Sequence, residues 1–190
     1  MNIKKYIQSI YYGLMNKIVL SRHQIKHGKN LMINGFARFC GNYNVTFGDD
    51  CRINSGREFN VIGGDTQCSF VCQKSGQIEI GNRVGISNST IVSFSKVTIE
   101  DCVLIGGGCK IYDSDFHSID FEHRMQRPDT HIKTKSILIK EGAFIGAQSI
   151  ILKGVTIGKH SVVGAGSVVT KDIPDGEIWG GNPAVFIRKV

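Results

Sequence analysis

His117 is the residue of this 190-residue chain best placed for acid–base chemistry. It lies in the segment IYDSDFHSID, which runs from Ile111 to Asp120. A neutral imidazole near pH 7 can take the proton of a hydroxyl group while that hydroxyl attacks an acyl carbon. Asp115 and Asp120 lie close enough in the sequence to orient the ring. The residues alone leave a second interpretation open, in which His117 is a solvated loop residue.

A metal centre is not expected, because the histidines are badly spaced for one. None lies between Gly28 and Phe116, so His117, His123 and His131 would all have to come from one segment. A catalytic zinc site ordinarily needs three protein ligands that converge on the ion and leave one position open.

The six cysteines form no CxxC pair, and no charged leader with a long apolar core precedes them. We therefore expect reduced thiols that act as small apolar residues in a cytoplasmic protein.

A repeat of six residues predicts the element that positions His117. From Ile139 onward an aliphatic residue recurs at every sixth position, and the fifth residue of each hexad is small. The aliphatic series is Ile139, Ile145, Ile151, Ile157, Val163 and Val169, and the small series is Ala143, Ser149, Val155, Ser161 and Ser167. This period matches neither the 3.6 of a helix nor the 2 of a flat strand. It is typical of short strands wound into a triangular coil, so the sequence predicts a β-helical solenoid.

The repeat is interrupted most strongly between Ile111 and Ile139, which it would place six residues apart. Each coil of a solenoid contacts only its neighbours, and its interior has no spare volume, so inserted residues must leave the coil as a loop. Loops of about 22 residues are usually functional or disordered. This loop holds three of the six histidines.

The first 30 residues carry six basic residues and no acid, out of a formal net charge of +7 for the chain. Apolar residues recur there at helical spacing, which predicts a basic amphipathic helix. They are Ile3, Tyr6, Ile7, Ile10, Tyr11, Leu14 and Ile18. An uncapped coil end exposes strand edges, so we expect the helix to cover that end. Peripheral contact with an anionic membrane and packing against another subunit are the alternatives.

The domain organisation expected from these patterns is a basic helical segment over residues 1–30 and a β-helix over residues 31–190, with a loop at 112–136. No stretch reaches the ~18 apolar residues of a membrane span. No basic stripe continues onto the body, so nucleic acid is not an expected partner.

Three blocks of sequence resemble the bacterial hexapeptide-repeat acyltransferases, a superfamily of left-handed parallel β-helices. The blocks are the loop from Asp113 to Asp120, the stretch ILKGVTIGKHSVVGAGSVVTKDIPDG from Ile151 to Gly176, and GGNPAVFIR from Gly180 to Arg188. The second and third blocks narrow the resemblance to the maltose, galactoside, xenobiotic and capsular-polysaccharide O-acetyltransferases. The fold it implies is an all-β, left-handed parallel β-helix with an N-terminal amphipathic helix and a long excursion loop.

The resemblance also implies roles for single residues. His117 matches the catalytic base of the family, and Asn88 matches an asparagine beside the reacting groups. A structural alternative for Asn88 is a corner residue in a left-handed turn.

Five further residues match positions that contact coenzyme A in the family. Ala147 and Ala165 match positions along its pantetheine arm, and Thr170, Lys171 and Arg188 match positions toward its adenine and phosphates. Lysine and arginine can make charge-assisted hydrogen bonds to phosphate. The alternatives are a solvated Lys171 and a surface charge at Arg188.

Two positions depart from the family pattern. Phe144 stands where many relatives have a tryptophan, and Val185 stands where a basic residue commonly follows GNPA. A stacking contact and a phosphate contact are therefore in doubt.

The activity implied is transfer of acetyl from acetyl-CoA to a sugar hydroxyl, in surface or capsular polysaccharide biosynthesis. The family further implies a homotrimer with active sites between subunits, in the cytoplasm or peripherally at the inner face of the membrane. The alternative activity is N-acetylation of a nucleotide-linked amino sugar, although residues 1–70 contain no GxGxxG. A scaffold without enzymatic activity is a third interpretation.

Overall fold

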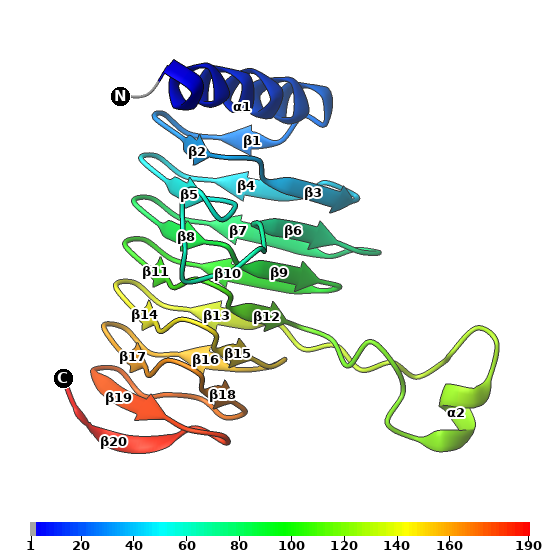
Figure 1. Ribbon diagram of the computed structural model, residues 1–190. Coiled ribbons are helices and arrows are strands. Elements are labelled where there is room, and N and C mark those ends of the chain that lie inside the picture. Colours follow the sequence, from blue (N-terminus) through cyan, green and yellow to red (C-terminus); the bar gives the residue numbers. More distant parts are fainter. Residues whose placement is uncertain (1–2) are drawn as a thin grey trace.

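The computed structural model describes residues 3–190, with side chains from residue 7 onward. It is a tall stack of coils with one helix, α1 (Ile3–Arg22), across the first end. A hairpin of β19 (Glu177–Gly180) and β20 (Val185–Lys189) closes the other end (Figure 1). Among the described residues, no helix combines the length and the hydropathy that crossing a bilayer requires.

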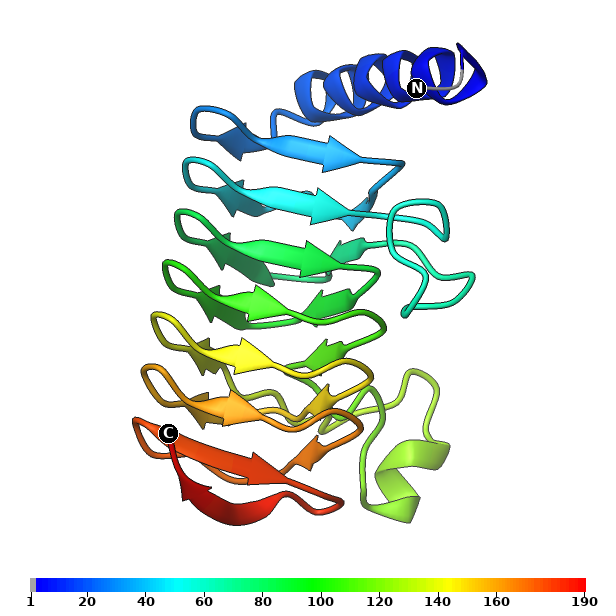
Figure 2. The same ribbon diagram turned by 60° about the vertical axis from the view of Figure 1, so that its left-hand side comes forward.

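Three parallel sheets form the sides of the stack, and successive strands of the chain pass from one sheet to the next (Figure 2). The first sheet contains β1 (Lys26–His27), β4 (Val45–Phe47), β7 (Gln77–Ile80), β10 (Lys96–Ile99), β13 (Ile137–Ile139) and β16 (Thr156–Ile157). The second contains β2 (Met32–Asn34), β5 (Arg52–Asn54), β8 (Gly85–Ser87), β11 (Leu104–Ile105), β14 (Phe144–Ile145), β17 (Val162–Val163), β19 and the antiparallel β20. The third contains β3 (Arg38–Gly41), β6 (Ser69–Cys72), β9 (Thr90–Ser93), β12 (Lys110–Tyr112), β15 (Ile150–Ile151) and β18 (Val168–Val169). The predicted left-handed β-helix is confirmed.

The hexad residues stack on one another from coil to coil. Ile99 pairs with Ile80 on one side and Ile139 on the other, and Ile111 pairs with Ile151. All six residues of the regular aliphatic series are buried at 0% exposure, which builds one continuous core. Burying each such side chain contributes roughly 1.5–3 kcal/mol.

The small fifth residues occupy the interior corners, as the repeat predicts. Ser149, Ser161 and Ser167 are buried there. Each hydroxyl donates to a backbone carbonyl of the corner, at 2.8 Å from Ser149 to Gly146 and 2.6 Å from Ser161 to Pro174. A buried hydroxyl without such a partner would cost roughly 1–3 kcal/mol, so serine fits the corner only because these carbonyls are in reach.

The triangular coil has three corners, which run along the stack as three edges. The first edge joins the first sheet to the second, the second edge joins the second sheet to the third, and the third edge joins the third sheet to the first. Two long segments leave these edges. The cap loop, residues 55–68, leaves the second edge, and the arm, residues 113–136, leaves the third edge and projects far from the stack (Figure 1).

α1 covers the coil end with a mixed face that carries Tyr12, Asn16, Val19 and Leu20. Asn16 is buried there, where its Nδ2 donates to the Gly35 carbonyl at 2.7 Å. Leu20 joins the core, and the ring of Tyr12 meets Phe59 edge-on at 6.0 Å between centroids. The expectation that the helix covers the end is therefore confirmed, but the apolar stripe is not the covering face.

Candidate active site

The arm begins as a two-stranded ribbon that holds its base rigid. The Asp115 N–H donates to the Lys133 carbonyl at 3.1 Å, and the Lys135 N–H donates to the Asp113 carbonyl at 2.9 Å. Asp113 is fully buried, and its carboxylate accepts hydrogen bonds from Ser93, Phe94 and Ser95 at 2.7 to 2.9 Å. These bonds fix the arm to the preceding coil at the third edge.

His117 follows this ribbon, and its ring pairs with Asp129 from the returning part of the arm. Nδ1 lies 2.9 Å from Oδ2 of Asp129. The histidine side chain is 72% exposed, whereas that of Asp129 is 12% exposed. The Asp129 carboxylate also accepts the Ser118 N–H at 3.2 Å. A carboxylate only accepts hydrogen bonds, so Nδ1 carries the shared proton and the Nε2 lone pair faces outward.

The two aspartates that the sequence offered as partners of the ring are engaged elsewhere, so that part of the prediction is wrong. Asp115 pairs through Oδ1 with Lys153 of the next coil at 2.6 Å, while its Oδ2 is buried and has no hydrogen-bond partner in the described part of the chain. Asp120 caps the short helix α2 (Phe121–Met125) by accepting the His123 N–H at 3.1 Å. This bond holds the pKa of the Asp120 carboxyl below its usual range. Both residues shape the arm, and neither carboxylate bonds to the His117 ring, although the Asp115 carbonyl accepts the His117 N–H at 2.7 Å.

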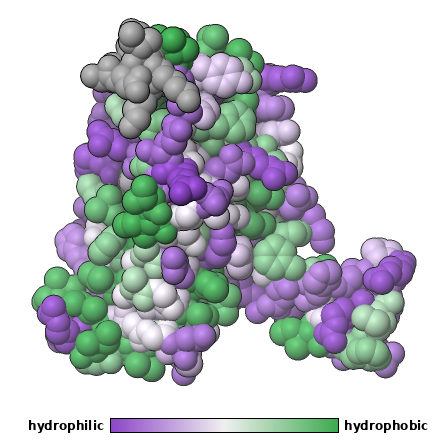
Figure 3. All heavy atoms as spheres, viewed as in Figure 1, coloured by the Kyte–Doolittle hydropathy of each residue, from purple (hydrophilic) through white to green (hydrophobic). Residues whose placement is uncertain are grey.

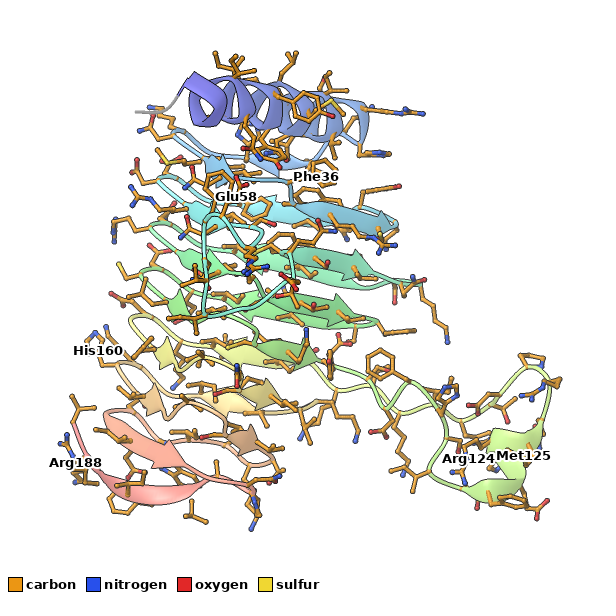
Figure 4. All side chains as sticks on the ribbon, in the orientation of Figure 1. Phe36, Glu58, Arg124, Met125, His160 and Arg188 are labelled. Atoms are coloured by element: carbon orange, nitrogen blue, oxygen red, sulfur yellow. The ribbon has the colours of Figure 1, made fainter. Side chains whose placement is uncertain are left out.

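The tip of the arm is folded by its own hydrogen bonds. The Arg124 guanidinium donates to the carbonyls of Ser118 and Ile119, both at 2.9 Å. The rings of His123 and His131 stack with their centroids 3.9 Å apart. Arg124 and Met125 mark this tip in Figure 4, well away from the coils. The described tip encloses a pocket of about 470 Å³, lined by Ser118, Ile119, Asp120, His123, His131 and Lys133.

Asn88 lies on the second edge, away from the arm, and both the oxygen and the nitrogen of its amide bond to the cap loop. It is buried at 0% exposure with φ +40°. Oδ1 accepts the Gly56 N–H at 2.7 Å, and Nδ2 donates to the Asn60 carbonyl at 2.8 Å. The structure therefore gives Asn88 the corner role and uses it to hold the cap loop. It does not bring Asn88 to His117 within one chain.

Ala147 and Ala165 lie one above the other on the second edge, below the cap loop. The coils approach very closely there: a Cβ on Gly146 would lie 2.5 Å from the Ala165 nitrogen, and a Cβ on Gly106 would lie 2.6 Å from the Ala147 nitrogen. The result is a column of glycine and alanine with little side chain on its outer surface. An extended chain such as pantetheine could approach the backbone along this column.

The other three predicted contacts of coenzyme A fall into two places. Thr170 and Lys171 follow β18 at the third edge and line a pocket of about 220 Å³ together with Trp179, Ala184 and Phe186. Arg188 pairs with Ile178 at the start of β19, which is the first-edge end of that strand. Arg188 and His160 accordingly lie on the side of the stack opposite the arm (Figure 4). Within one chain, Ala147 lies near Ala165 and Thr170 lies near Lys171, whereas Arg188 is separate from both pairs.

Sequence reasoning missed Asp129, Lys153 and Trp179. Asp129 is twelve residues from His117, across a turn that the hexad repeat does not describe. Lys153 could have been found, because the repeat places it on the third edge one coil below the arm. Within the residues described, no cluster of three or more His, Cys, Asp or Glu side chains is arranged to hold a metal ion.

The chemistry open to this arrangement is proton transfer at an exposed ring nitrogen. The fixed carboxylate sets the tautomer and the direction of the imidazole, and the exposed Nε2 can accept a proton from a substrate hydroxyl. The column on the second edge is open to an extended ligand. These two features lie on different edges of the same chain.

The sequence and the architecture are similar to those of known hexapeptide-repeat proteins. The family described as bacterial transferase hexapeptide (six repeats) matches residues 136–171. A candidate acetyltransferase of Saccharomyces cerevisiae is 38% identical over 122 residues, which cover 64% of this chain and 60% of that protein. The galactoside O-acetyltransferase of Lactococcus lactis is 37% identical over 103 residues, or 54% of this chain and 48% of that enzyme. The chain thus spans roughly half to three fifths of the length of these curated relatives.

A solved structure matches over more of the chain. The hexapeptide-repeat acetyltransferase of Vibrio cholerae, complexed with acetyl coenzyme A, aligns with a TM-score of 0.62 at 28% identity. The alignment covers 92% of this chain and 76% of the other.

Proposed function

We propose that this chain, which belongs to the hexapeptide-repeat acetyltransferase family, transfers the acetyl group of acetyl-CoA to a sugar hydroxyl. The observation that carries the proposal is the pairing of an exposed His117 with a sheltered Asp129 at 2.9 Å. A surface histidine without a function would not need a carboxylate held in place by a backbone N–H of the same turn. General bases are oriented in this way.

In the proposed reaction, Nε2 of His117 removes the proton of the acceptor hydroxyl as its oxygen attacks the thioester carbon. A C–O bond forms and the C–S bond breaks. The proton on Nε2 then passes to the departing coenzyme A sulfur, so the enzyme returns to its starting state. Asp129 stabilises the imidazolium that exists between these two transfers.

Acetyl-CoA would lie along the column that contains Ala147 and Ala165, with Lys171 near its phosphates. The absence of large side chains on the column supports the first contact. The pocket beside Thr170 and Lys171 supports the second. Arg188 is part of this site only if a neighbouring subunit supplies it, because it lies at the first-edge end of β20.

The acceptor is proposed to be a saccharide that enters the pocket at the tip of the arm. This pocket starts at Ser118, next to His117, and offers a hydroxyl, a carboxylate, two imidazoles and a lysine around the apolar side chain of Ile119. Sugars present hydroxyl groups and weakly apolar ring faces, which such a mixture can meet. The galactoside O-acetyltransferase among the relatives agrees with a sugar acceptor, and a role in polysaccharide modification would follow.

We further propose a homotrimer with each active site between two subunits. The arm, which contains His117, projects away from its own coils (Figure 3), while the alanine column faces out from another edge. Within one chain, the His117 ring and a ligand on the alanine column would lie at different edges and would not meet. An arm that reaches the second edge of a neighbour would complete the site, and threefold symmetry would give three equal sites.

The test is acetyl transfer from radiolabelled acetyl-CoA to a panel of sugars, amino sugars and oligosaccharides. We expect labelled product with a saccharide, and we expect mild base to release the label, because esters hydrolyse where amides survive. Base-stable label on an amino sugar would establish N-acetylation instead. No label on any acceptor, together with no shift of the melting temperature by acetyl-CoA, would overturn the proposal.

A further inference from the structure

We infer that α1 docks the protein on an anionic lipid surface through an outer stripe formed by Ile7, Ile10, Tyr11, Leu14 and Ile18. This inference does not depend on the proposed acetyl transfer. It rests on which face of α1 is already occupied, on what the other face exposes, and on the charge around it.

The outer stripe is an exposed apolar surface on an ordered helix. Its five side chains are between 49% and 61% exposed. They recur at intervals of three and four residues, so they form one continuous row along the helix. Apolar surface lies over α1 at the top of the molecule in Figure 3. Single exposed apolar residues are ordinary, but a contiguous row marks a surface that meets another apolar phase.

The opposite face of α1 is already packed against the solenoid. Asn16 anchors it by donating to the Gly35 carbonyl and accepting from the Ala37 N–H. Leu20 is buried in the core beside it. At 100° per residue, Asn16 lies about 180° from the centre of the outer stripe. Rotating α1 so that the outer stripe faced the coils would break the hydrogen bonds of Asn16. The outer stripe is therefore not the face that covers the coil end.

Basic residues border the stripe, and acids are absent. Lys17 lies on one flank and Arg22 on the other by the same helical geometry, and both are exposed. The first 30 residues hold six basic residues and no Asp or Glu. An apolar row with basic flanks on a helix too polar to span is typical of interfacial membrane helices. Each nearby basic residue adds attraction to anionic headgroups.

The same charges argue against a second copy of the chain as the occupant. In a twofold contact each subunit presents the same patch, so stripe against stripe would bring together two surfaces that both carry basic flanks such as Lys17 and Arg22. With no acid in the first 30 residues of either chain, this contact gathers like charges. α1 is also the outermost element at its end in both views, so it can lie flat on a surface without the coils or the arm intervening (Figures 1 and 2).

The experiment is co-sedimentation of the full chain with extruded vesicles, either phosphatidylcholine alone or a mixture with phosphatidylglycerol. We expect binding to the anionic vesicles, weaker binding to the neutral ones, and partial loss of binding when salt is raised. Leu14→Glu should reduce binding about tenfold or more, because it removes an apolar side chain that the lipid surface would bury and adds a negative charge. Val61→Glu is the matched control: Val61 is 79% exposed but lies in the cap loop, and its variant should bind as the parent does.

Two outcomes of these measurements would overturn the inference. Equal vesicle binding by the parent and Leu14→Glu, with unchanged melting temperatures, would overturn it, as would no binding by the parent. In the second case, light scattering shows whether Leu14→Glu reduces the size of the assembly, which would make the stripe an interface between copies. Acetyl-CoA is absent from these measurements, so their outcome is separate from that of the proposed enzymatic activity.

Discussion

The Nδ1 atom of His117 lies 2.9 Å from Oδ2 of Asp129, and the two residues come from opposite sides of the same arm. The contact ties the outgoing part of the arm to its returning part, beside the exposed ring that we propose as the general base. The orientation of the imidazole is therefore a property of the arm's own fold rather than of the coils beneath it.

His117→Ala should reduce kcat by roughly 10²–10⁴-fold, because the acceptor hydroxyl loses its base. Binding of acetyl-CoA, measured by calorimetry, should stay within about twofold of the parent, since the proposed column lies on another edge. His160→Ala is the control, because this exposed histidine lies on the side of the stack opposite the arm. Full activity in His117→Ala would contradict the assignment of the base.

Asp129→Asn should lower kcat by about 10²-fold or more, because an amide can donate to Nδ1 and so favour the wrong tautomer. The Michaelis constant for acetyl-CoA should change little. Asp120→Asn is the matched variant: asparagine is as good a helix cap as aspartate, so its kcat should remain close to that of the parent, and any loss should fall on the Michaelis constant for the acceptor, whose proposed pocket Asp120 lines. The order of the two variants in a steady-state assay checks the corrected partner of His117, and the reverse order would restore Asp120 to that role.

Asp120 also predicts a dependence on pH. Its pKa is lowered by the His123 N–H bond, so the cap stabilises the arm at neutral pH and is lost as pH falls through and below the ordinary range of a carboxyl, near 3.8. Proteolysis of the arm should accelerate over that acid range in the parent. Asp120→Asn should show a smaller change with pH, since its amide does not titrate. An identical pH dependence in both proteins would exclude Asp120 as its cause.

Lys171→Glu should raise the Michaelis constant for acetyl-CoA about tenfold, because a charge-assisted bond to phosphate is replaced by repulsion. Lys74→Glu makes the same change of charge in the part of the third edge nearer α1, where Lys74 lies over the Phe94 ring. It should leave the constant unchanged. If both variants behave alike, net charge rather than a defined contact governs binding.

Mixing two inactive variants tests the shared active site. Ala165→Trp should block the column, and His117→Ala removes the base. If each site takes its base from one subunit and its column from the next, random mixed trimers regain about a quarter of the parental sites. The assay compares co-refolded protein with each variant alone. No gain on mixing, or a monomer by light scattering, would show that the site lies within one chain.

Burial of the thiols predicts which cysteines react. Cys51, Cys68, Cys72 and Cys109 are buried, and burial raises the pKa of both Cys68 and Cys72 to about 11. At pH 8, iodoacetamide should label only the partly exposed pair, Cys40 and Cys102. Between pH 9 and 11 the unfolded thiols ionise before the folded ones, so stability should decline with rising pH in that range. Mass spectrometry of the labelled peptides checks the first statement, and rapid labelling of Cys68 in the folded protein would contradict it.

The coils could be predicted from the sequence because every aliphatic residue of the hexad series occupies the same kind of position, with its side chain in the core. Ile145 and Val163, for example, are paired neighbours in the second sheet and are both fully buried. In a parallel coil only one strand register stacks these aliphatic residues on one another, so the spacing of the repeat determines the register. The interior corners are equally determined, because only small side chains such as Ser149 fit there.

The candidate site was less predictable because its contacts lie outside the repeat. The partner of His117 depends on how the arm turns back, and four aspartates lie within twelve residues of it in the sequence: Asp113, Asp115, Asp120 and Asp129. The orientation of α1 is a similar case: both faces could have covered the coil end, and the hydrogen bonds of Asn16 decide which face does. The role of Asn88 beside the reacting groups stays a prediction, because within one chain its amide bonds to the cap loop and the arm lies at another edge.

The stack of coils also works as a spacer of fixed height. Four steps along the first sheet separate β1, just beneath α1, from β13, where the arm rejoins the solenoid. At about 4.8 Å per step, the arm stands roughly 19 Å further along the axis than β1. A coil inserted or deleted between them would shift the arm by one such step and leave both ends unchanged. The number of coils therefore sets the distance along the axis between α1 and the arm.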